Sequence, residues 1–243
     1  MSLIVTLYVP EGIVIAGDSR LTLNWSEGFN NKEHRHSVAM SDSNTKIFSI
    51  NHKFGLGTFG AADIHGIPIA GFINQFTEEM VKPETEIAEM PQLLLNFFGA
   101  KFSFPDINFY LIGYQIEEGI SSPHVYHIHV AGNTFSRKNL VTGQLSHGAT
   151  WGGEIEILSR LLNSARLKQD ETWVDFADTP IPWNYMTLQD AIDFSVFAVR
   201  TTIETMRFQQ KEKTVGGPID ILVVKPNEAP IWINKKELNF RLV

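Results

Sequence analysis

Two short apolar runs near the start of the chain, joined by residues typical of a turn, constrain the fold most strongly. The runs are Leu3–Val9 and residues 13–16, and Pro10-Glu11-Gly12 separates them. β-Branched and aromatic side chains favour the extended backbone of a strand, and proline and glycine favour a reversal of the chain. We therefore predict a β-hairpin. It brings Ser2, just before the first strand, near Asp18, just after the second.

Ser2 becomes chemically interesting if Met1 is removed, which the small size of serine favours. Ser2 then carries a free α-amine beside its own hydroxyl. An α-amino group has a pKa of about 7.7–8.0, so part of it is neutral near pH 7 and can accept a proton. One residue then supplies both the nucleophile and the general base. From the residues alone, an ordinary polar N-terminus remains the alternative.

Composition limits the classes of protein and partner. A chain of 243 residues without an evident linker suits a single domain over residues 1–243, and a hydrophobic fraction of 43% can fill its core. The net charge of −7 gives no basic footprint, so we expect no nucleic acid partner. There is no cysteine for a disulfide or a thiolate zinc site. The apolar start is too short for a membrane span and lacks the features of a signal peptide, so we expect no membrane association and a cytoplasmic location.

The rest of the chain alternates groups of strands with pairs of helices. Apolar periodicity predicts helices over residues 67–80, 91–101, 154–166 and 187–209, and strands over residues 46–50, 54–59, 108–115, 124–131, 135–140, 219–225 and 230–234. Residues 23–44 and 167–185 have neither period, and we predict loops there. The glycine-rich residues 146–153 predict a turn. This order predicts an α+β fold, with two packed antiparallel sheets covered by helices.

Three colinear stretches resemble the β-type subunits of proteasomes. Ala16-Gly17-Asp18-Ser19-Arg20-Leu21-Thr22 is similar to the Ala-Ala-Asp-Ser-Arg-x-Thr of that family, and Ser2 precedes Asp18 by the family's step from nucleophile to aspartate. Residues 46–50 with 57–63 resemble its lysine-bearing strand and Gly-Ala turn, and residues 214–221 its C-terminal Gly-Gly turn. The resemblance implies a bacterial-type proteasome-like protein with the four-layer αββα sandwich of N-terminal-nucleophile (Ntn) hydrolases.

The same resemblance implies that peptide bonds are hydrolysed through an acyl-enzyme. Ser2 would attack, and Lys46 would lower the pKa of its hydroxyl by electrostatic interaction. Asp18 would keep Lys46 charged and oriented. The N–H of Gly60 would bind the developing oxyanion.

Four further residues are assigned by the resemblance with less support from their motifs. Thr150, with Ser146 as the alternative, would support the nucleophile. Glu212 falls where the family has an aspartate that orients the terminal amine. Leu21 and Thr58 are expected to shape the substrate pocket beside Ser2.

The expected partners are a peptide or unfolded-protein substrate and further copies of the chain in a homo-oligomeric ring or ring-like stack. We expect no cofactor. We also expect no metal site, because His127 and His129 share a strand face but two ligands are too few, and Glu33-His34-x-His36 lies in a predicted solvated loop.

Two departures from the family keep other functions open. Val215 stands where the family has a serine, and a retained Met1 would turn the α-nitrogen of Ser2 into an amide that is not a base. The alternatives are a non-proteolytic structural ring subunit and a small-molecule amidase of the same fold.

Overall fold

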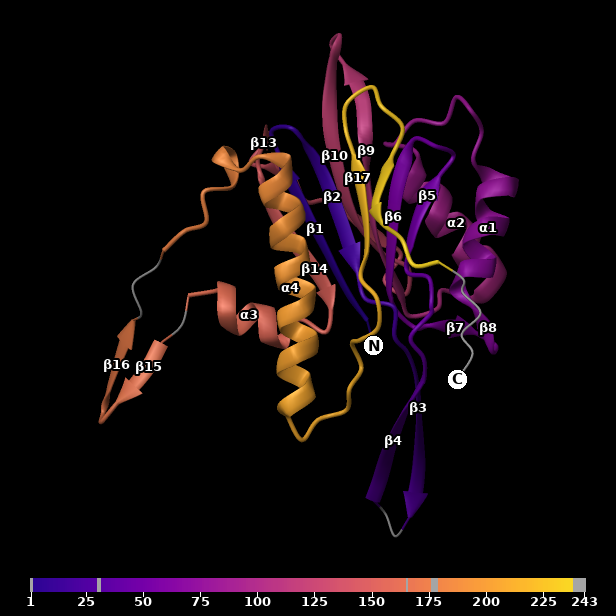
Figure 1. Cartoon of the computed structure of the whole chain (residues 1–243). Coiled ribbons are helices and arrows are strands. Elements are labelled where there is room, and N and C mark those ends of the chain that lie inside the picture. The colour runs from indigo at the N-terminus through magenta and orange to yellow at the C-terminus, as the bar shows by residue number, and fades with distance from the viewer. Residues whose placement is uncertain (1, 30–31, 165, 176–178, 238–243) are drawn as a thin grey trace.

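The computed structural model describes residues 2–29, 32–164, 166–175 and 179–237, without the side chains of residues 23–29, 32–37 and 39. This part of the chain contains two five-stranded antiparallel sheets, four α-helices and four short two-stranded sheets. Figure 1 shows the two large sheets between α4 on one side and α1 and α2 on the other. The mixed α+β class predicted from the sequence is confirmed.

The first sheet is built around the predicted hairpin. Its order is β14 (Gly148–Gly153), β1 (Leu3–Val9), β2 (Gly12–Gly17), β17 (Asp220–Val224) and β18 (Ile231–Asn234). The hairpin closes where Val9 pairs with Gly12, and Ile4 pairs with Gly17 near its open end. Every residue of β1 and β2 is buried, because both faces of these strands are covered.

The second sheet follows the predicted strands closely. Its order is β11 (Thr134–Arg137), β10 (Ile120–His129), β9 (Ile107–Glu117), β6 (Phe54–Gly60) and β5 (Ile47–Ile50). The long hairpin of β9 and β10 forms one half of it, and β6 pairs with β9 from Gly55 to Gly60.

Apolar side chains form three buried clusters. One lies between the two sheets and includes Ile4 and Ile15 from the first sheet and Ile112 from the second. Helices α1 (Ile69–Met80) and α2 (Met90–Phe102) contribute to a cluster with the second sheet. Helices α3 (Glu156–Leu162) and α4 (Leu188–Phe208) contribute to a cluster with the first. Each side of each large sheet is therefore in contact with an apolar partner.

The start of α4 agrees with its sequence signal. The Thr187 hydroxyl accepts a hydrogen bond from the Asp190 N–H, and the Asp190 carboxylate accepts one from the Thr187 N–H. This reciprocal capping box satisfies backbone donors that the first turn of a helix leaves free.

Three loop or turn predictions were wrong. Residues 23–44, predicted as a loop, contain most of the hairpin formed by β3 (Leu21–Phe29) and β4 (Lys32–Ser41). Residues 167–185 include a second hairpin, of β15 (Arg166–Gln169) and β16 (Thr172–Asp175), and a short 3-10 turn at Trp183–Tyr185. The glycine-rich run predicted as a turn is strand β14.

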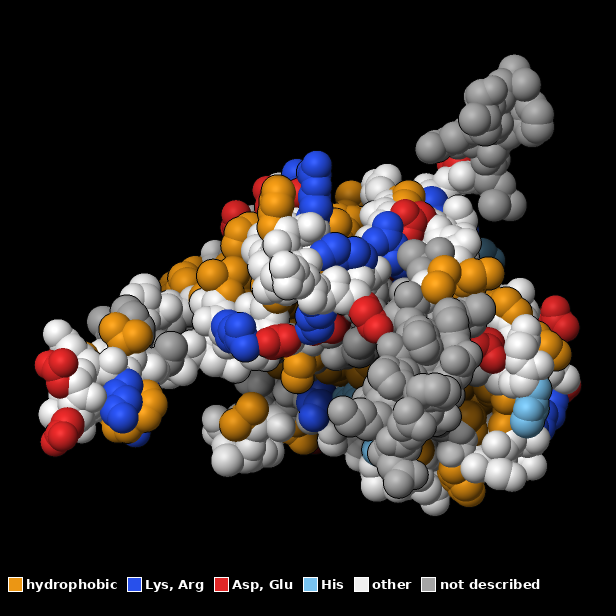
Figure 2. All heavy atoms as spheres, turned by 90° about the horizontal axis from the view of Figure 1, so that it is seen from below, with side chains coloured by type: hydrophobic (Ala, Val, Ile, Leu, Met, Phe, Trp, Pro, Cys, Tyr) orange, Lys and Arg blue, Asp and Glu red, His pale blue; other side chains and the backbone are white. Residues whose placement is uncertain are grey.

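Both hairpins project from the body (Figure 1), and for the second hairpin the exposure of its residues explains why the pattern was missed. Every described residue of β15 and β16 is exposed, so neither strand has a buried face that would impose an apolar alternation of period two. Figure 2 shows apolar, basic and acidic side chains side by side on the projecting β15–β16 hairpin.

The remaining elements are small. They are the strand pairs β7 (Asp63–Ile64) with β8 (Ile67–Pro68), and β12 (Leu140–Val141) with β13 (Gln144–Leu145). Among the described residues, no helix is both long enough and apolar enough to cross a membrane.

Candidate active site

Several chain segments meet at the open end of the β1–β2 hairpin. Ser2 immediately precedes β1, Asp18 follows β2, and Lys46 precedes β5. The amide of Thr58, in β6, donates a hydrogen bond to the Lys46 carbonyl at 2.9 Å. The strand ends of both large sheets therefore bring these residues to one end of the molecule, although they are far apart in sequence.

A buried ion pair lies at the centre of this end. Lys46 Nζ donates to Asp18 Oδ1 at 2.8 Å, and each residue is 1% exposed. A lysine so far from water is costly to keep charged without a carboxylate partner. Burial lowers the pKa of Lys46 from its ordinary value, and the nearby Asp18 charge opposes that effect.

Asp18 is held by the backbone as well as by Lys46. Its Oδ1 also accepts the N–H of Leu3 at 2.9 Å, and its Oδ2 accepts the N–H groups of Arg20 at 3.1 Å and Gly216 at 3.0 Å. One carboxylate oxygen thus contacts both Lys46 Nζ and the amide that follows Ser2. The carboxylate joins the start of β1, the end of β2 and the Gly-Gly turn before β17.

Ser2 is 5% exposed and is fixed by its own backbone. Its carbonyl accepts the N–H of Glu154 at 2.7 Å, which extends the pairing of Leu3 with Gly153 by one position. Gly153 has a φ of +95°, and a Cβ there would lie 1.8 Å from the Ser2 carbonyl oxygen. Only glycine allows this close approach.

The side chain of Ser2 belongs to the face of β1 that meets the second sheet. Ile4 and Tyr8 lie in the cluster between the sheets, whereas Leu3 and Val5 lie in the cluster with α4. Because side chains alternate along a strand, the even position of Ser2 puts its side chain on the same side as Ile4. Lys46 precedes β5, a strand of that second sheet.

The predicted pocket and oxyanion residues lie on β6 and at the start of β3. Thr58 is 5% exposed, and its Oγ1 has no hydrogen-bond partner among the described residues. Leu21 opens β3, one residue after Arg20. Gly60 ends β6 with a φ of +99°, and a Cβ there would lie 2.7 Å from the Asp106 carbonyl oxygen. At the spacing of a strand, Gly60 lies about 7 Å beyond Thr58.

Two predicted residues are not brought beside Ser2. Thr150 pairs with Thr6, four positions further along β1, or about 13 Å at the spacing of a strand. Its hydroxyl donates to Tyr110 Oη at 3.0 Å. Glu212 is exposed and follows α4, where its carbonyl accepts the N–H of Thr214 at 3.1 Å.

The residues that lie beside Ser2 instead are Gly153 and Glu154, which the sequence reasoning missed. Glycine is disfavoured in strands, so residues 148–153 predicted a turn rather than a partner strand of β1. Glu154 gave no signal of its own, because its position depends on pairing between segments about 150 residues apart.

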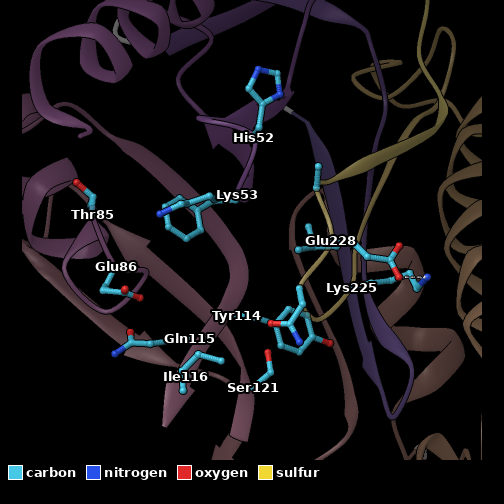
Figure 3. A pocket seen from close by; sticks show the side chains of 14 residues that line it. His52, Lys53, Thr85, Glu86, Tyr114, Gln115, Ile116, Ser121, Lys225 and Glu228 are labelled. Carbon is cyan, nitrogen blue, oxygen red and sulfur yellow. Dashed lines mark hydrogen bonds and ion pairs between the residues drawn. The ribbon is translucent and has the colours of Figure 1, made fainter. Parts of the chain in front are cut away.

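The hollow in Figure 3 is distinct from this end of the molecule. Val224, which lines it, pairs with Ile13, whereas Asp220 pairs with Gly17 beside the buried ion pair. The cavity measures about 310 Å³, and burial raises the pKa of its Tyr114 to about 12. Lys225 pairs with Glu228 at its margin. The cavity therefore lies at the end of the first sheet opposite to Asp18 and Lys46.

The histidines considered as metal ligands have other partners. His127 Nε2 lies 3.1 Å from Asn108 Oδ1, and burial lowers the His127 pKa to about 4. His129 Nε2 lies 4.0 Å from Asp106 Oδ1. In the part of the chain that the structure describes, no three His, Asp or Glu residues are grouped so as to hold a metal ion. The side chains of residues 33–36 lie outside the described part.

Comparison with solved structures finds a related fold in a Gly-1 mutant of Anbu from Hyphomicrobium sp. strain MC1. The TM-score is 0.55, the sequence identity is 16%, and the match covers 96% of this chain and 87% of the Anbu chain. At this identity the likeness shows the fold alone. No protein-family model matches the sequence, and no match was found among curated proteins.

Proposed function

We propose that this chain is a proteasome-like Ntn hydrolase, a single domain over residues 1–243 with the four-layer αββα sandwich, and that it cleaves peptide bonds through Ser2 after loss of Met1. The observation that carries the proposal is the buried Asp18–Lys46 pair, whose shared oxygen also binds the amide following Ser2. Burying two charges is expensive, and a purely structural role could be filled by apolar side chains. The likeness to Anbu supports the fold on which the proposal depends.

The proposed reaction has two halves. The Ser2 Oγ attacks the carbonyl carbon of the substrate, and its proton passes to the Ser2 α-amine. The Gly60 N–H stabilises the resulting oxyanion. The C–N bond then breaks, and the leaving amine takes the proton. Water attacks the acyl-enzyme, gives a proton to the α-amine and releases the acid as Ser2 Oγ is reprotonated.

Lys46 and Asp18 act on the Ser2 hydroxyl in this scheme. A positive charge at Lys46 Nζ favours the developing alkoxide, and Asp18 sets both the position and the charge of that group. Leu21 and Thr58 shape the pocket for the substrate side chain. Thr150 and Glu212 are left out of the proposed mechanism, because the Thr150 hydroxyl binds Tyr110 and Glu212 is exposed.

The proposed substrate is a peptide or an unfolded protein, and the proposed assembly is a homo-oligomeric ring or ring-like stack. Large apolar side chains on the described surface support self-association: Tyr185 is 86% exposed and Phe208 is 80% exposed. Light scattering at micromolar concentration should detect a species well above the 27.4 kDa of one chain. A single species of monomeric mass would count against the ring.

The central experiment combines mass measurement with hydrolysis of fluorogenic peptides. The intact mass should show loss of one methionine, and Ser2→Ala should abolish hydrolysis without changing the melting temperature. Thr6→Val is the matched control, because it removes a buried hydroxyl without a described partner from β1, the strand that follows Ser2. Thr6→Val should retain activity.

The outcomes separate the competing functions. Hydrolysis that survives Ser2→Ala unchanged would place the chemistry elsewhere. Inactivity of a verified Met1-free protein on peptides would favour the structural ring subunit. Activity on short acyl-amides but not on peptides would favour the small-molecule amidase.

A further inference from the structure

Glu154 is a buried carboxylate that the reaction scheme above does not use. It is 5% exposed, and its backbone N–H binds the Ser2 carbonyl at 2.7 Å. The positive φ of Gly153 turns the chain sharply at this point, next to the start of β1. A buried carboxylate normally needs a specific reason to be there, because leaving water is costly for its charge.

The charged neighbours of Glu154 come from different segments. Lys211 Nζ, just beyond α4, donates to Glu154 Oε1 at 2.9 Å and to Glu156 Oε2 at 2.8 Å. Hydrogen bonds to Glu156 and Glu154 raise the pKa of Lys211. On the other side of β1 lies β2, which is followed by Asp18, the partner of Lys46. Lys211 therefore neutralises Glu154 only in part, since it is shared with a second carboxylate.

We propose that Glu154 is the positioning residue for the α-amine of Ser2, and that Lys211 sets how strongly Glu154 attracts its positive charge. The inference rests on the proposed function, in which that amine accepts the proton of the Ser2 hydroxyl. A neighbouring carboxylate orients the amine and raises its pKa, because it favours the ammonium form. A nearby lysine limits the rise, so that part of the amine stays neutral near pH 7.

This assignment replaces Glu212 with a residue that the structure places next to Ser2. Glu212 is exposed, and its backbone carbonyl accepts the N–H of Thr214. Lys211 and Glu212 are adjacent in sequence. The resemblance therefore indicated the segment that contains both residues. Within that segment it is Lys211, not Glu212, that binds Glu154 beside Ser2.

The test measures the pKa of the Ser2 α-amine itself, by NMR of the ¹³C-labelled residue over a pH titration. The protein is released from a fusion by a protease so that Ser2 is its first residue. Glu154→Gln should lower the pKa of the amine, because it removes a neighbouring negative charge. Lys211→Met should raise it, because it leaves Glu154 without its counter-ion. We expect shifts of at least about half a pH unit in opposite directions.

Two controls make the reading specific. Glu212→Gln should leave the pKa of the amine unchanged. The double variant Glu154→Gln/Lys211→Met removes both charges, so it avoids leaving the buried Glu154 carboxylate without its counter-ion, and it should give a pKa between those of the single variants. It also keeps the proposal testable if Glu154→Gln alone does not fold.

The result separates this inference from the proposed function. Opposite shifts in a protein that hydrolyses no amide would uphold the role of Glu154 and reject the hydrolase. Hydrolysis that depends on Ser2, with a pKa of the amine that ignores both Glu154 and Lys211, would overturn the role of Glu154 and leave the hydrolase standing.

Discussion

Replacing Asp18 with asparagine should destabilise the protein far more than the loss of one surface charge. Asp18 Oδ1 accepts from Lys46 and Leu3, and Oδ2 accepts from Arg20 and Gly216. Asparagine has one oxygen and one NH₂ group, so either orientation points a donor at backbone donors. A buried donor left unpaired costs about 1–3 kcal/mol.

The same substitution removes the partner of Lys46. Breaking a buried ion pair by deleting one member costs about 3–5 kcal/mol, and loss of the Lys46 proton limits the penalty. Together the two effects predict a loss of about 4–6 kcal/mol in the free energy of unfolding. Lys46→Met is the comparison. It leaves the carboxylate with its three backbone donors, so its cost should be smaller by about 2 kcal/mol or more.

Urea denaturation of the wild type and both variants measures these differences, with the slope of the transition checked for constancy. The expected order of stability is wild type, then Lys46→Met, then Asp18→Asn. A loss below about 1 kcal/mol for Asp18→Asn, which is the scale of an exposed pair, would refute the argument. So would a larger cost for Lys46→Met.

The other predictions concern the backbone beside Ser2 and the histidine between the sheets. Gly153→Ala should destabilise by more than about 2 kcal/mol and abolish hydrolysis, because its Cβ would meet the Ser2 carbonyl oxygen at 1.8 Å; Gly119→Ala, with φ +82° and open space, should cost only about 1 kcal/mol in denaturation. Burial lowers the His127 pKa from 6.5 to about 4, so its unfolded form binds more protons between those values, and stability should fall as pH falls through that window. His127→Gln should remove about 3 kcal/mol of this change, which corresponds to about 2.5 pKa units at about 1.36 kcal/mol each. Identical pH profiles for the two proteins would exclude His127 as its source.

Much of the central fold could be predicted from the sequence, because its strands have buried faces. The run Leu3–Val9 and the Pro-Glu-Gly turn give the hairpin directly, and the structure has it at those residues. The helix after Thr187 is likewise marked by its capping residues and apolar face. In these segments, local preference and tertiary packing favour the same structure.

The projecting hairpins could not be found in this way. Residues 166–175 form two paired strands whose described side chains are all exposed. Exposed strand positions can hold polar or apolar side chains, so no alternating pattern marks these strands in the sequence. Strand β14 was hidden for another reason. Its Gly152 is required by tertiary contact, since a Cβ there would lie 2.3 Å from the ring of Phe59.

Some residues of the candidate site could likewise be predicted from local patterns, and others could not. Asp18 and Lys46 belong to segments with recognisable patterns, and the structure joins them in an ion pair. Glu154 and Lys211 meet only because β14 lies beside β1 and because the chain beyond α4 returns to that edge. No local pattern in the sequence predicts this contact between Glu154 and Lys211.

Covalent labelling of the Met1-free protein tests the central claim most directly. A β-lactone is a strained ester that acylates an activated hydroxyl, and peptide mapping by mass spectrometry locates the acyl group. The account predicts one label on Ser2, lost in Ser2→Ala, reduced at least tenfold in rate in Lys46→Met and unchanged in Thr6→Val. Acylation of another residue at the same rate in Ser2→Ala, or equal labelling of protein that retains Met1, would contradict it.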